Sequence, residues 1–275
     1  MVEPPSPGGR SVDAVAPDIA REEPVPRRQW LYSVGAIGAV VAVWAILGLV
    51  LPETLLPGPV PTVRALFDLG GVFFRALAAT LWHITAGTVL AVAFGVVIGI
   101  LMGRVRVVSA SLRDLIAIAQ TVPGLIIVTL AIIAFKLTPT AVLAVAFFFG
   151  LPNVVVAIWQ ATRNVDPRLL EMAQVYGHSE VSIMRRVIVP AIVPDIVTAL
   201  RVCVGILWHV VLFAEFIVGQ QGFGYQISLA LSSFQVAEIF AWGLAVVIIM
   251  VAMEYGLLRP LERRLLASRP KAPAR

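Results

Sequence analysis

The sequence predicts an all-α integral membrane protein, and three features of its composition support that fold class. Of the 275 residues, 59% are hydrophobic and only 13% are charged. The mean hydropathy is +0.93, far above that of ordinary soluble domains. The apolar residues gather in six runs, each close to the ~20 residues that a helix needs to cross the hydrocarbon core of a bilayer.

The six expected membrane spans are separated by turn residues or by clusters of charge. Their bounds are Trp30–Leu51, Thr80–Met102, Leu112–Phe135, Thr140–Thr162, Val193–Gly219 and Glu238–Leu258. Residues 1–29 are rich in Pro, Gly and charge without a helical or strand period, which predicts a disordered tail. After that tail we expect a first span with an outer interfacial segment at 30–79, a core of five spans at 80–265, and a second tail at 266–275.

Lys and Arg residues are distributed unequally between the two sides of the expected spans. An even number of spans puts both termini on one side, and seventeen basic residues fall on that side against three opposite. The three are Arg64, Arg75 and Lys136. Because basic loops stay in the cytoplasm, we expect the termini and residues 166–190 to be cytoplasmic. The net charge of +5 then reflects orientation in the membrane, so nucleic acid is not an expected partner.

The connections between the expected spans carry turn signals. A short interfacial helix is expected around Val63–Phe73, and Arg104–Ser111 is expected to be a short polar connection. Pro139 marks a turn between the third and fourth spans. The segment Gln220–Ala237 contains no Lys or Arg and has two early glycines, which predicts an outer turn or a re-entrant gate.

The longest polar stretch between spans, residues 166–190, predicts an elbow of two short helices. Asp166 is a favourable N-cap, and Pro167 suits the first helical position. Apolar side chains then recur at i, i+3, i+4 and i+7, which is the period of one helix face. They are Leu169, Met172, Ala173 and Tyr176.

A glycine turn is expected to separate the two helices of the elbow. Gly177 can adopt the left-handed conformation that ends a helix. Ser179 can cap the second helix with Glu180 in its first turn, and Pro190 is expected to stop it.

This elbow resembles the cytoplasmic coupling loop in permease subunits of bacterial ATP-binding-cassette importers. That loop has the pattern E-A-A-x3-G-x9-I-x-L-P, and Met172 replaces its second small residue. The matching residues are Glu171, Ala173, Gly177, Val187, Val189 and Pro190. A looser likeness, from about Thr80 to Leu265, is similar to the nitrate, sulfonate, taurine and bicarbonate branch of the binding-protein-dependent transport family.

The looser likeness rests on several short segments. They are the surroundings of Pro123 and Pro152, Ala214-Glu215, the Gly222-Phe223-Gly224-Tyr225 turn and Leu261-Glu262-Arg263. Relatives in this branch usually carry Trp-Phe-Gly-x-Gly after the third span, where this chain has Ala134-Phe135-Lys136-Leu137-Thr138. They commonly carry Arg at the position of His83, which we expect to be a hydrogen-bonded structural histidine.

The resemblance implies a type I importer permease fold and a set of partners. The chain would form half of a translocation pathway in the cytoplasmic (inner) membrane, with a second permease copy or paralogue. Two cytoplasmic ATP-binding subunits would bind ATP and Mg, so no cofactor is expected in this chain. An extracytoplasmic substrate-binding protein would deliver a small anion such as a sulfonate, taurine or nitrate. The coupling residues implied by the match are Glu171, Ala173, Tyr176, Gly177 and Pro190.

Polar and helix-breaking residues inside the expected spans are candidates for the pathway. A proline removes a helix hydrogen bond and leaves backbone groups that lipid cannot satisfy, which favours a watery path over a simple kink. Trp208 and His209 lie near mid-depth of the fifth span, where lining and packing are equally expected. Glu215 lies near the outer end and either reaches water or pairs. The candidates are Gln120, Pro123, Pro152, Asn153, Trp208, His209 and Glu215.

Missing motifs exclude several enzyme classes. The two lysines, Lys136 and Lys271, follow Phe135 and Pro270, so no Gly-Lys-Ser/Thr phosphate loop exists and the chain cannot be the ATPase. Neither His-Glu-x-x-His nor Gly-x-Ser-x-Gly occurs, and the single Cys203 excludes a disulfide within the chain. No catalytic or metal-binding residues are expected.

Two alternatives stay open at the level of the sequence. Residues 166–190 could instead form an amphipathic helix on the membrane surface, with Arg185 and Arg186 on anionic headgroups. The whole chain could be an ion-gradient-driven secondary transporter, or a membrane enzyme or scaffold subunit. Co-purification with an ATP-binding protein would distinguish a permease from these alternatives.

Overall fold

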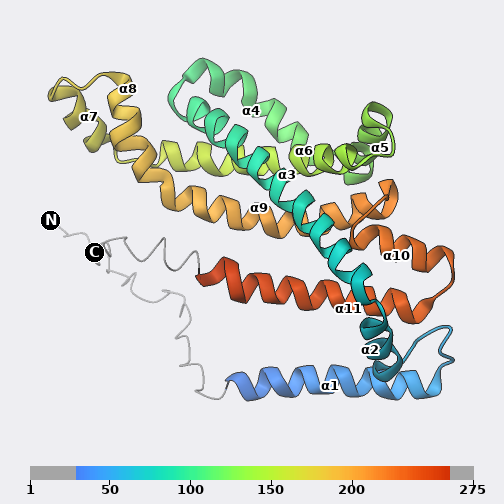
Figure 1. Ribbon diagram of the computed structural model, residues 1–275. Coiled ribbons are helices and arrows are strands. Elements are labelled where there is room, and N and C mark those ends of the chain that lie inside the picture. Colours follow the sequence, from blue (N-terminus) through green and yellow to red (C-terminus); the bar gives the residue numbers. More distant parts are fainter. Residues whose placement is uncertain (1–28, 261–275) are drawn as a thin grey trace, which may run out of the picture.

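The computed structural model describes residues 29–260, which are helical apart from short connections and contain no strand (Figure 1). The helices are α1 (Gln29–Val50), α2 (Pro59–Asp68), α3 (Gly70–Arg104), α4 (Arg106–Thr121), α5 (Gly124–Phe135), α6 (Pro139–Arg163), α7 (Pro167–Val175), α8 (Glu180–Ile183), the π-helix η1 (Met184–Ile188), α9 (Val189–Val218), α10 (Phe223–Ser232), α11 (Val236–Met253) and the π-helix η2 (Glu254–Leu258). The expected tails, Gln29 excepted, and Leu261-Glu262-Arg263 lie outside the described residues.

Four of the described helical segments are long and apolar enough to cross a membrane. They are Gly70–Arg104, Pro139–Arg163, Glu180–Val218 and Val236–Gly256. The α4–α5 pair passes the same test as one span, although its two helices are bent by 99° at their junction. In α1 the apolar stretch is shorter, Val34–Val50. Most residues of all six expected apolar runs are therefore helical. That all six runs cross the membrane stays a prediction.

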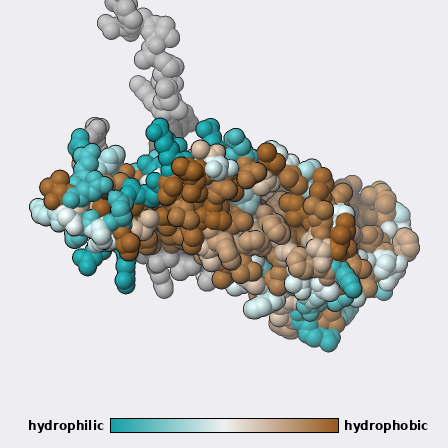
Figure 2. Space-filling view, turned by 90° about the horizontal axis from the view of Figure 1, so that it is seen from above, coloured by the Kyte–Doolittle hydropathy of each residue, from teal (hydrophilic) through white to brown (hydrophobic). Residues whose placement is uncertain are grey.

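The helices have a common direction and two distinct ends. Helices α1, α6, α9 and α11 run along one direction, and α3 crosses them obliquely (Figure 1). Helices α7 and α8 lie at the left end, and α2 and the short α10, which packs against α9 and α11, lie toward the right. On the face seen in Figure 2, hydrophobic residues cover the middle and hydrophilic residues gather at the end of α7 and α8. This distribution is expected when the elbow lies outside the hydrocarbon layer.

Glycines bring α3 and α6 into close contact at the centre of the fold. A Cβ atom added to Gly95, Gly99 or Gly103 would lie 2.6, 2.7 or 2.5 Å from a side-chain atom of α6, closer than real Cβ atoms approach. The α6 neighbours are, in order, Val154, Ile158 and Thr162. The i, i+4 spacing places the three glycines on one face of α3, as in the small-residue interfaces of membrane helices. The backbone of α3 therefore packs directly on α6.

The outer boundary of α3 differs from the prediction. The helix begins at Gly70 instead of Thr80, and the interfacial helix is Pro59–Asp68 instead of Val63–Phe73. Gly70 has a φ of +51°, which turns the chain between α2 and α3. Arg75 is exposed and lies in the second turn of this long helix.

The inner connection of α3 is also shorter than predicted. Only Val105 separates α3 from α4, so the expected polar connection Arg104–Ser111 is wrong. Charged and apolar residues alternate with a helical period from Arg106 onward, and the chain forms an amphipathic helix there. Within α4 no residue is buried, so this helix lies on the outside of the described fold.

Candidate functional site

The elbow between α6 and α9 has the helix ends that the sequence predicts. The Asp166 carboxylate accepts a hydrogen bond from the Arg168 backbone N–H at 2.9 Å, which caps α7. Gly177 has a φ of +73° directly after the helix, and the His178 N–H donates to the Ala173 carbonyl at 3.1 Å. This pattern is the glycine-based helix end that the position of Gly177 predicted.

The second helix of the elbow begins as predicted but does not stop at Pro190. The Ser179 hydroxyl accepts from the Ser182 N–H at 3.3 Å, and Glu180 lies in the first turn. The helix then continues through the π-helical turn Met184–Ile188 into α9. The predicted stop at Pro190 is wrong. The π-turn shifts the hydrogen-bond pattern, so Pro190 lies in the first turn of a new helical segment, where no backbone N–H donor is needed.

The predicted apolar stripe of α7 divides between two surfaces. Ala173 is buried, and Leu170 is partly buried against the core. The carboxylate of Glu171 is exposed and has no ion-pair partner within residues 29–260. The apolar residues that point outward are Leu169, Met172, Val175 and Tyr176. The elbow therefore presents apolar area and one unpaired carboxylate on its free face.

At the opposite end of the fold, α9 carries a fully buried carboxylate, Glu215. Thr80 Oγ1 of α3 donates to Glu215 Oε2 at 2.8 Å, and the Gly224 N–H of α10 donates to the same oxygen at 3.1 Å. His83 Nδ1 of α3 lies 2.8 Å from Glu215 Oε1. The Phe223 N–H in turn donates to Thr80 Oγ1 at 2.9 Å. Since a buried carboxylate is stable only with such partners, this cluster ties α10 to α3 and α9.

Two glycines of the turn between α9 and α10 make room for this carboxylate. Gly222 has a φ of +99°, and a Cβ atom there would lie 2.2 Å from the Glu215 carboxylate. A Cβ atom on Gly224 would lie 2.1 Å from the Leu212 carbonyl oxygen. The turn therefore closes over Glu215 because both positions are glycine. Glu215 was expected either to reach water or to pair, and it pairs. His83 is hydrogen-bonded, as predicted.

Two of the expected pathway residues, Gln120 and Asn153, lie side by side near the helix break. Pro123 stands at the 99° bend between α4 and α5. Gln120 Nε2 lies 3.5 Å from Asn153 Oδ1 of α6. Asn153 also lines a cavity of about 250 Å³ between α6 and α9. Its other polar lining residues are Gln160, Asn164, Asp195 and Thr198.

Pro152 does not break α6, which corrects the prediction. The helix is continuous from Pro139 to Arg163, and Pro152 is buried within it. Asn153 Nδ2 donates to the Phe149 carbonyl at 2.8 Å, within the same helix. One missing backbone hydrogen bond is tolerated because the helix packs tightly on both sides here.

Trp208 and His209 point in different directions from α9. Trp208 is 2% exposed and belongs to the main core, whereas His209 is exposed, with Nδ1 3.1 Å from the Gly205 carbonyl oxygen. Neighbouring residues on a helix are about 100° apart, so the two rings cannot face one surface. Only His209 is positioned to contact a path on the outside of this chain.

Comparison with known families identifies the protein class. Residues 91–255, which include the elbow, Asn153 and Glu215, match the family model described as binding-protein-dependent transport system inner membrane component. The chain belongs to this family. It is therefore a permease, a membrane component of a transport system.

Named relatives of the permease cover most of its length. It is 30% identical to the taurine transport system permease protein TauC of Escherichia coli, over 86% of this chain and 90% of TauC. It is 28% identical to SsuC of Bacillus subtilis, named for aliphatic sulfonate transport, over 90% of this chain and 92% of SsuC. Against the nitrate import permease protein NrtB of Leptolyngbya laminosa it is 27% identical over 62% of this chain and 60% of NrtB.

Solved structures show the same fold. A chain of the inward-facing MetNI methionine ABC transporter matches with a TM-score of 0.61 and 18% identity, over 73% of the permease and 97% of that chain. A chain of a bacterial ABC transporter that imports alginate matches with a TM-score of 0.62 and 15% identity, over 86% and 96%. The permease thus has the all-α fold of type I importer permeases.

The sequence alone did not indicate the role of Thr80 in this arrangement. Thr80 was expected only as the first residue of a span, yet it bridges Glu215 and α10. The available signal was its i, i+3 spacing to His83, which places both polar side chains on one face of an apolar helix. Within residues 29–260 no group of three His, Cys, Asp or Glu side chains is arranged to hold a metal ion.

Proposed function

We propose that this permease forms one half of the translocation pathway of an ATP-driven importer, with a second copy or a paralogue forming the other half. Two cytoplasmic ATP-binding subunits, which hold ATP and Mg, drive transport through the elbow. An extracytoplasmic binding protein delivers the solute. The elbow is the observation that carries the proposal, since it presents apolar area and a free carboxylate at the hydrophilic end of the molecule.

The free face of α7 has the chemistry of a helix that docks into a groove. Leu169, Met172 and Tyr176 are exposed at helical spacing and offer apolar area to a partner. Glu171 lies among them and can accept charge-assisted hydrogen bonds from basic groups of that partner. Ala173 is buried and lets α7 pack closely on the permease, and Pro190 starts the long helix that follows.

Motion at the elbow has a direct route to the outer end. The helical segment Glu180–Val218 is 39 residues long and has no break. At 1.5 Å per residue the whole segment spans about 58 Å, and it carries the buried Glu215 near its far end. A displacement of the elbow therefore moves the helix that holds α10, which is how ATP-driven motion would reach the outer gate.

We propose a small anion, such as a sulfonate, taurine or nitrate, as the solute. The names of TauC, SsuC and NrtB support this class. Gln120, Asn153 and His209 are the polar pathway candidates with exposed surface, and Pro123 and Pro152 set the helix geometry around them. The buried Trp208 and Glu215 act from inside, by packing and by holding α10.

Two elbow variants test the coupling role. Glu171→Ala removes a charged contact worth about 1.5–3 kcal/mol in a desolvated groove and leaves the helix intact. Gly177→Val puts a β-branched residue at a φ of +73°, which tilts the two elbow helices against each other. In the reconstituted complex, both should lower uptake and its coupling to ATP hydrolysis, Gly177→Val more severely.

Matched controls lie at the other end of the molecule. Asp68→Ala removes an exposed carboxylate of α2, and Gly71→Val adds a side chain where a Cβ atom meets open space. Both controls should keep the coupling of the unmodified complex. Unchanged coupling in both elbow variants would contradict the proposal and favour a surface amphipathic helix instead.

A further inference from the structure

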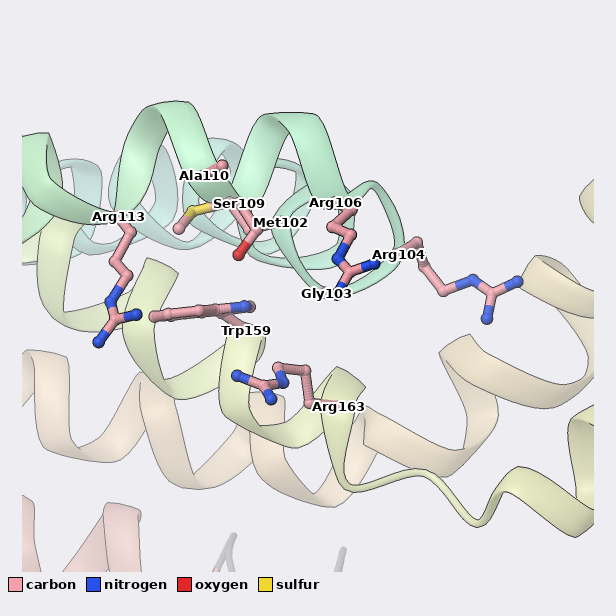
Figure 3. A pocket seen from close by; sticks show the side chains of 9 residues that line it. All are labelled: Met102, Gly103, Arg104, Arg106, Ser109, Ala110, Arg113, Trp159 and Arg163. Carbon is pink, nitrogen blue, oxygen red and sulfur yellow. The ribbon is translucent and has the colours of Figure 1, made fainter.

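A basic hollow lies where the ends of α3 and α6 meet the start of α4 (Figure 3). Its volume is about 380 Å³, and the Trp159 ring stands at its centre. Four arginines line it, and we call it the arginine hollow. They are Arg104, Arg106, Arg113 and Arg163. It lies at the elbow end of the fold, because Arg104 pairs with Glu180 of α8 at 2.9 Å.

Three of the four arginines lack an acidic partner. Of these four arginines, only Arg104 has a carboxylate of residues 29–260 at ion-pair distance, and in Figure 3 its side chain points away from the hollow. Arg163 places its guanidinium carbon 5.8 Å from the centre of the Trp159 ring. From α4, Arg113 points toward the same ring, whereas Arg106 lies on the side of the hollow nearer Arg104 (Figure 3). Like charges gathered around one hollow repel one another, and an anion between them removes that repulsion.

Two residues that line the hollow also carry neutral hydrogen-bond donors. The indole Nε1 of Trp159 is buried and has no hydrogen-bond partner within the described residues. Ser109 adds a hydroxyl to the lining. Helix α4 also begins here, and its N-cap residue Val105 supplies no side-chain cap for the first N–H groups. An anion with several oxygens, such as a phosphate, can accept from all of these donors.

The surroundings favour a lipid headgroup over a free anion. Helix α4 carries exposed aliphatic side chains on the same turns as its arginines, with Val107 74%, Leu115 60% and Ile118 61% exposed. A helix with basic and aliphatic residues at the end of membrane-spanning segments lies at the bilayer boundary. Acyl chains can cover the aliphatic residues while the phosphate occupies the hollow. Basic pockets between membrane helices on the cytoplasmic side bind acidic headgroups in this way.

We propose that the arginine hollow binds the phosphate of an anionic phospholipid of the cytoplasmic leaflet. The lipid neutralises Arg106, Arg113 and Arg163 and occupies the unpaired indole N–H of Trp159. The lipid thereby holds α4 against the ends of α3 and α6. The ion pair between Arg104 and Glu180 connects this region to the elbow. The proposal rests on the cytoplasmic position of the elbow and not on ATPase coupling, so the two can fail separately.

Native mass spectrometry of the purified complex tests the proposal. Phosphatidylglycerol is added in competition with phosphatidylcholine of the same acyl chains, and a further arm adds inorganic phosphate. The test variant is Arg113→Gln with Arg163→Gln, and the control is Arg64→Gln with Arg75→Gln, two arginines at the other end of the fold. Loss of two lipid-facing charges should weaken phosphatidylglycerol retention about thirtyfold, whereas the control retains it fully.

A charge-conserving variant separates binding from folding. Arg113→Lys with Arg163→Lys should restore much of the retention, and all variants should elute as assembled complexes. Equal retention by the Gln variant and the unmodified complex would overturn the proposal. So would equal retention of phosphatidylcholine, which indicates apolar binding only, or release of the lipid by millimolar inorganic phosphate, which indicates a free-anion site.

Discussion

At the scale of single residues, the end of the permease opposite the elbow depends on one fully buried carboxylate. Glu215 is bound by Thr80, His83 and the Gly224 N–H, and these groups belong to α3 and α10. Removing one partner of a buried charged group leaves the charge uncompensated, which costs more than the contact itself. The geometry of the α9–α10 turn is therefore as important as the side chains it covers.

Gly222→Ala tests that turn. The added Cβ atom would lie 2.2 Å from the Glu215 carboxylate, at a φ of +99° that side chains rarely adopt. We expect a loss of about 1–3 kcal/mol from the backbone alone, seen as a lower thermal midpoint of the purified complex. Gly205→Ala is the control, because a Cβ atom there meets open space. A midpoint equal to that of Gly205→Ala would show that the turn does not close over Glu215 in solution.

The sequence was sufficient to predict the helix ends of the elbow but not the long-range contacts of Glu215. The Asp166 and Ser179 caps and the left-handed Gly177 follow from neighbours a few positions away, so the sequence was sufficient. The contact between Thr80 and Glu215 joins residues 135 positions apart, and no local pattern specifies it. Lys136 has a φ of 60°, in the region that favours glycine, and no local sequence signal indicates a left-handed residue at this lysine.

At the scale of elements, the packing of α3 on α6 depends on small residues. Gly99→Val should force the two helices apart, since a Cβ atom would lie 2.7 Å from Ile158 Cβ and 2.9 Å from the Val155 carbonyl oxygen. Overpacking of this kind costs about 1–3 kcal/mol. The yield of assembled complex and its thermal midpoint should both fall. Gly205→Val on α9 provides the control, and an equal effect of the two variants would contradict close α3–α6 packing.

Helix types were predicted well at this scale, and prolines were predicted poorly. The period of apolar residues was sufficient to locate the helices, but Pro152 and Pro190 lie within continuous helical segments. The buried position of Pro152 in α6 and the π-turn before Val189 make the two prolines tolerable, and both features depend on the three-dimensional neighbourhood.

At the scale of the whole molecule, we expect the elbow and the α9–α10 turn to lie on opposite sides of the membrane. After Cys203→Ser, single cysteines at Ser11, Gln174 and Gln221 report the topology. An impermeant thiol reagent applied to intact cells should label only Gln221→Cys, because basic segments remain cytoplasmic. Labelling of the Ser11 or Gln174 variant in intact cells would reverse the orientation, and labelling after lysis checks that each site is accessible.

Site-specific photo-crosslinking shows whether the elbow contacts an ATP-binding subunit. A benzophenone amino acid is placed at Val175 of α7, which is 86% exposed, and at Phe67 of α2, which is 80% exposed. In the assembled complex, the probe at Val175 should crosslink to the ATP-binding subunit, and the probe at Phe67 should not. Crosslinking of Val175 to lipid alone, or equal crosslinking of the subunit from both positions, would contradict the account.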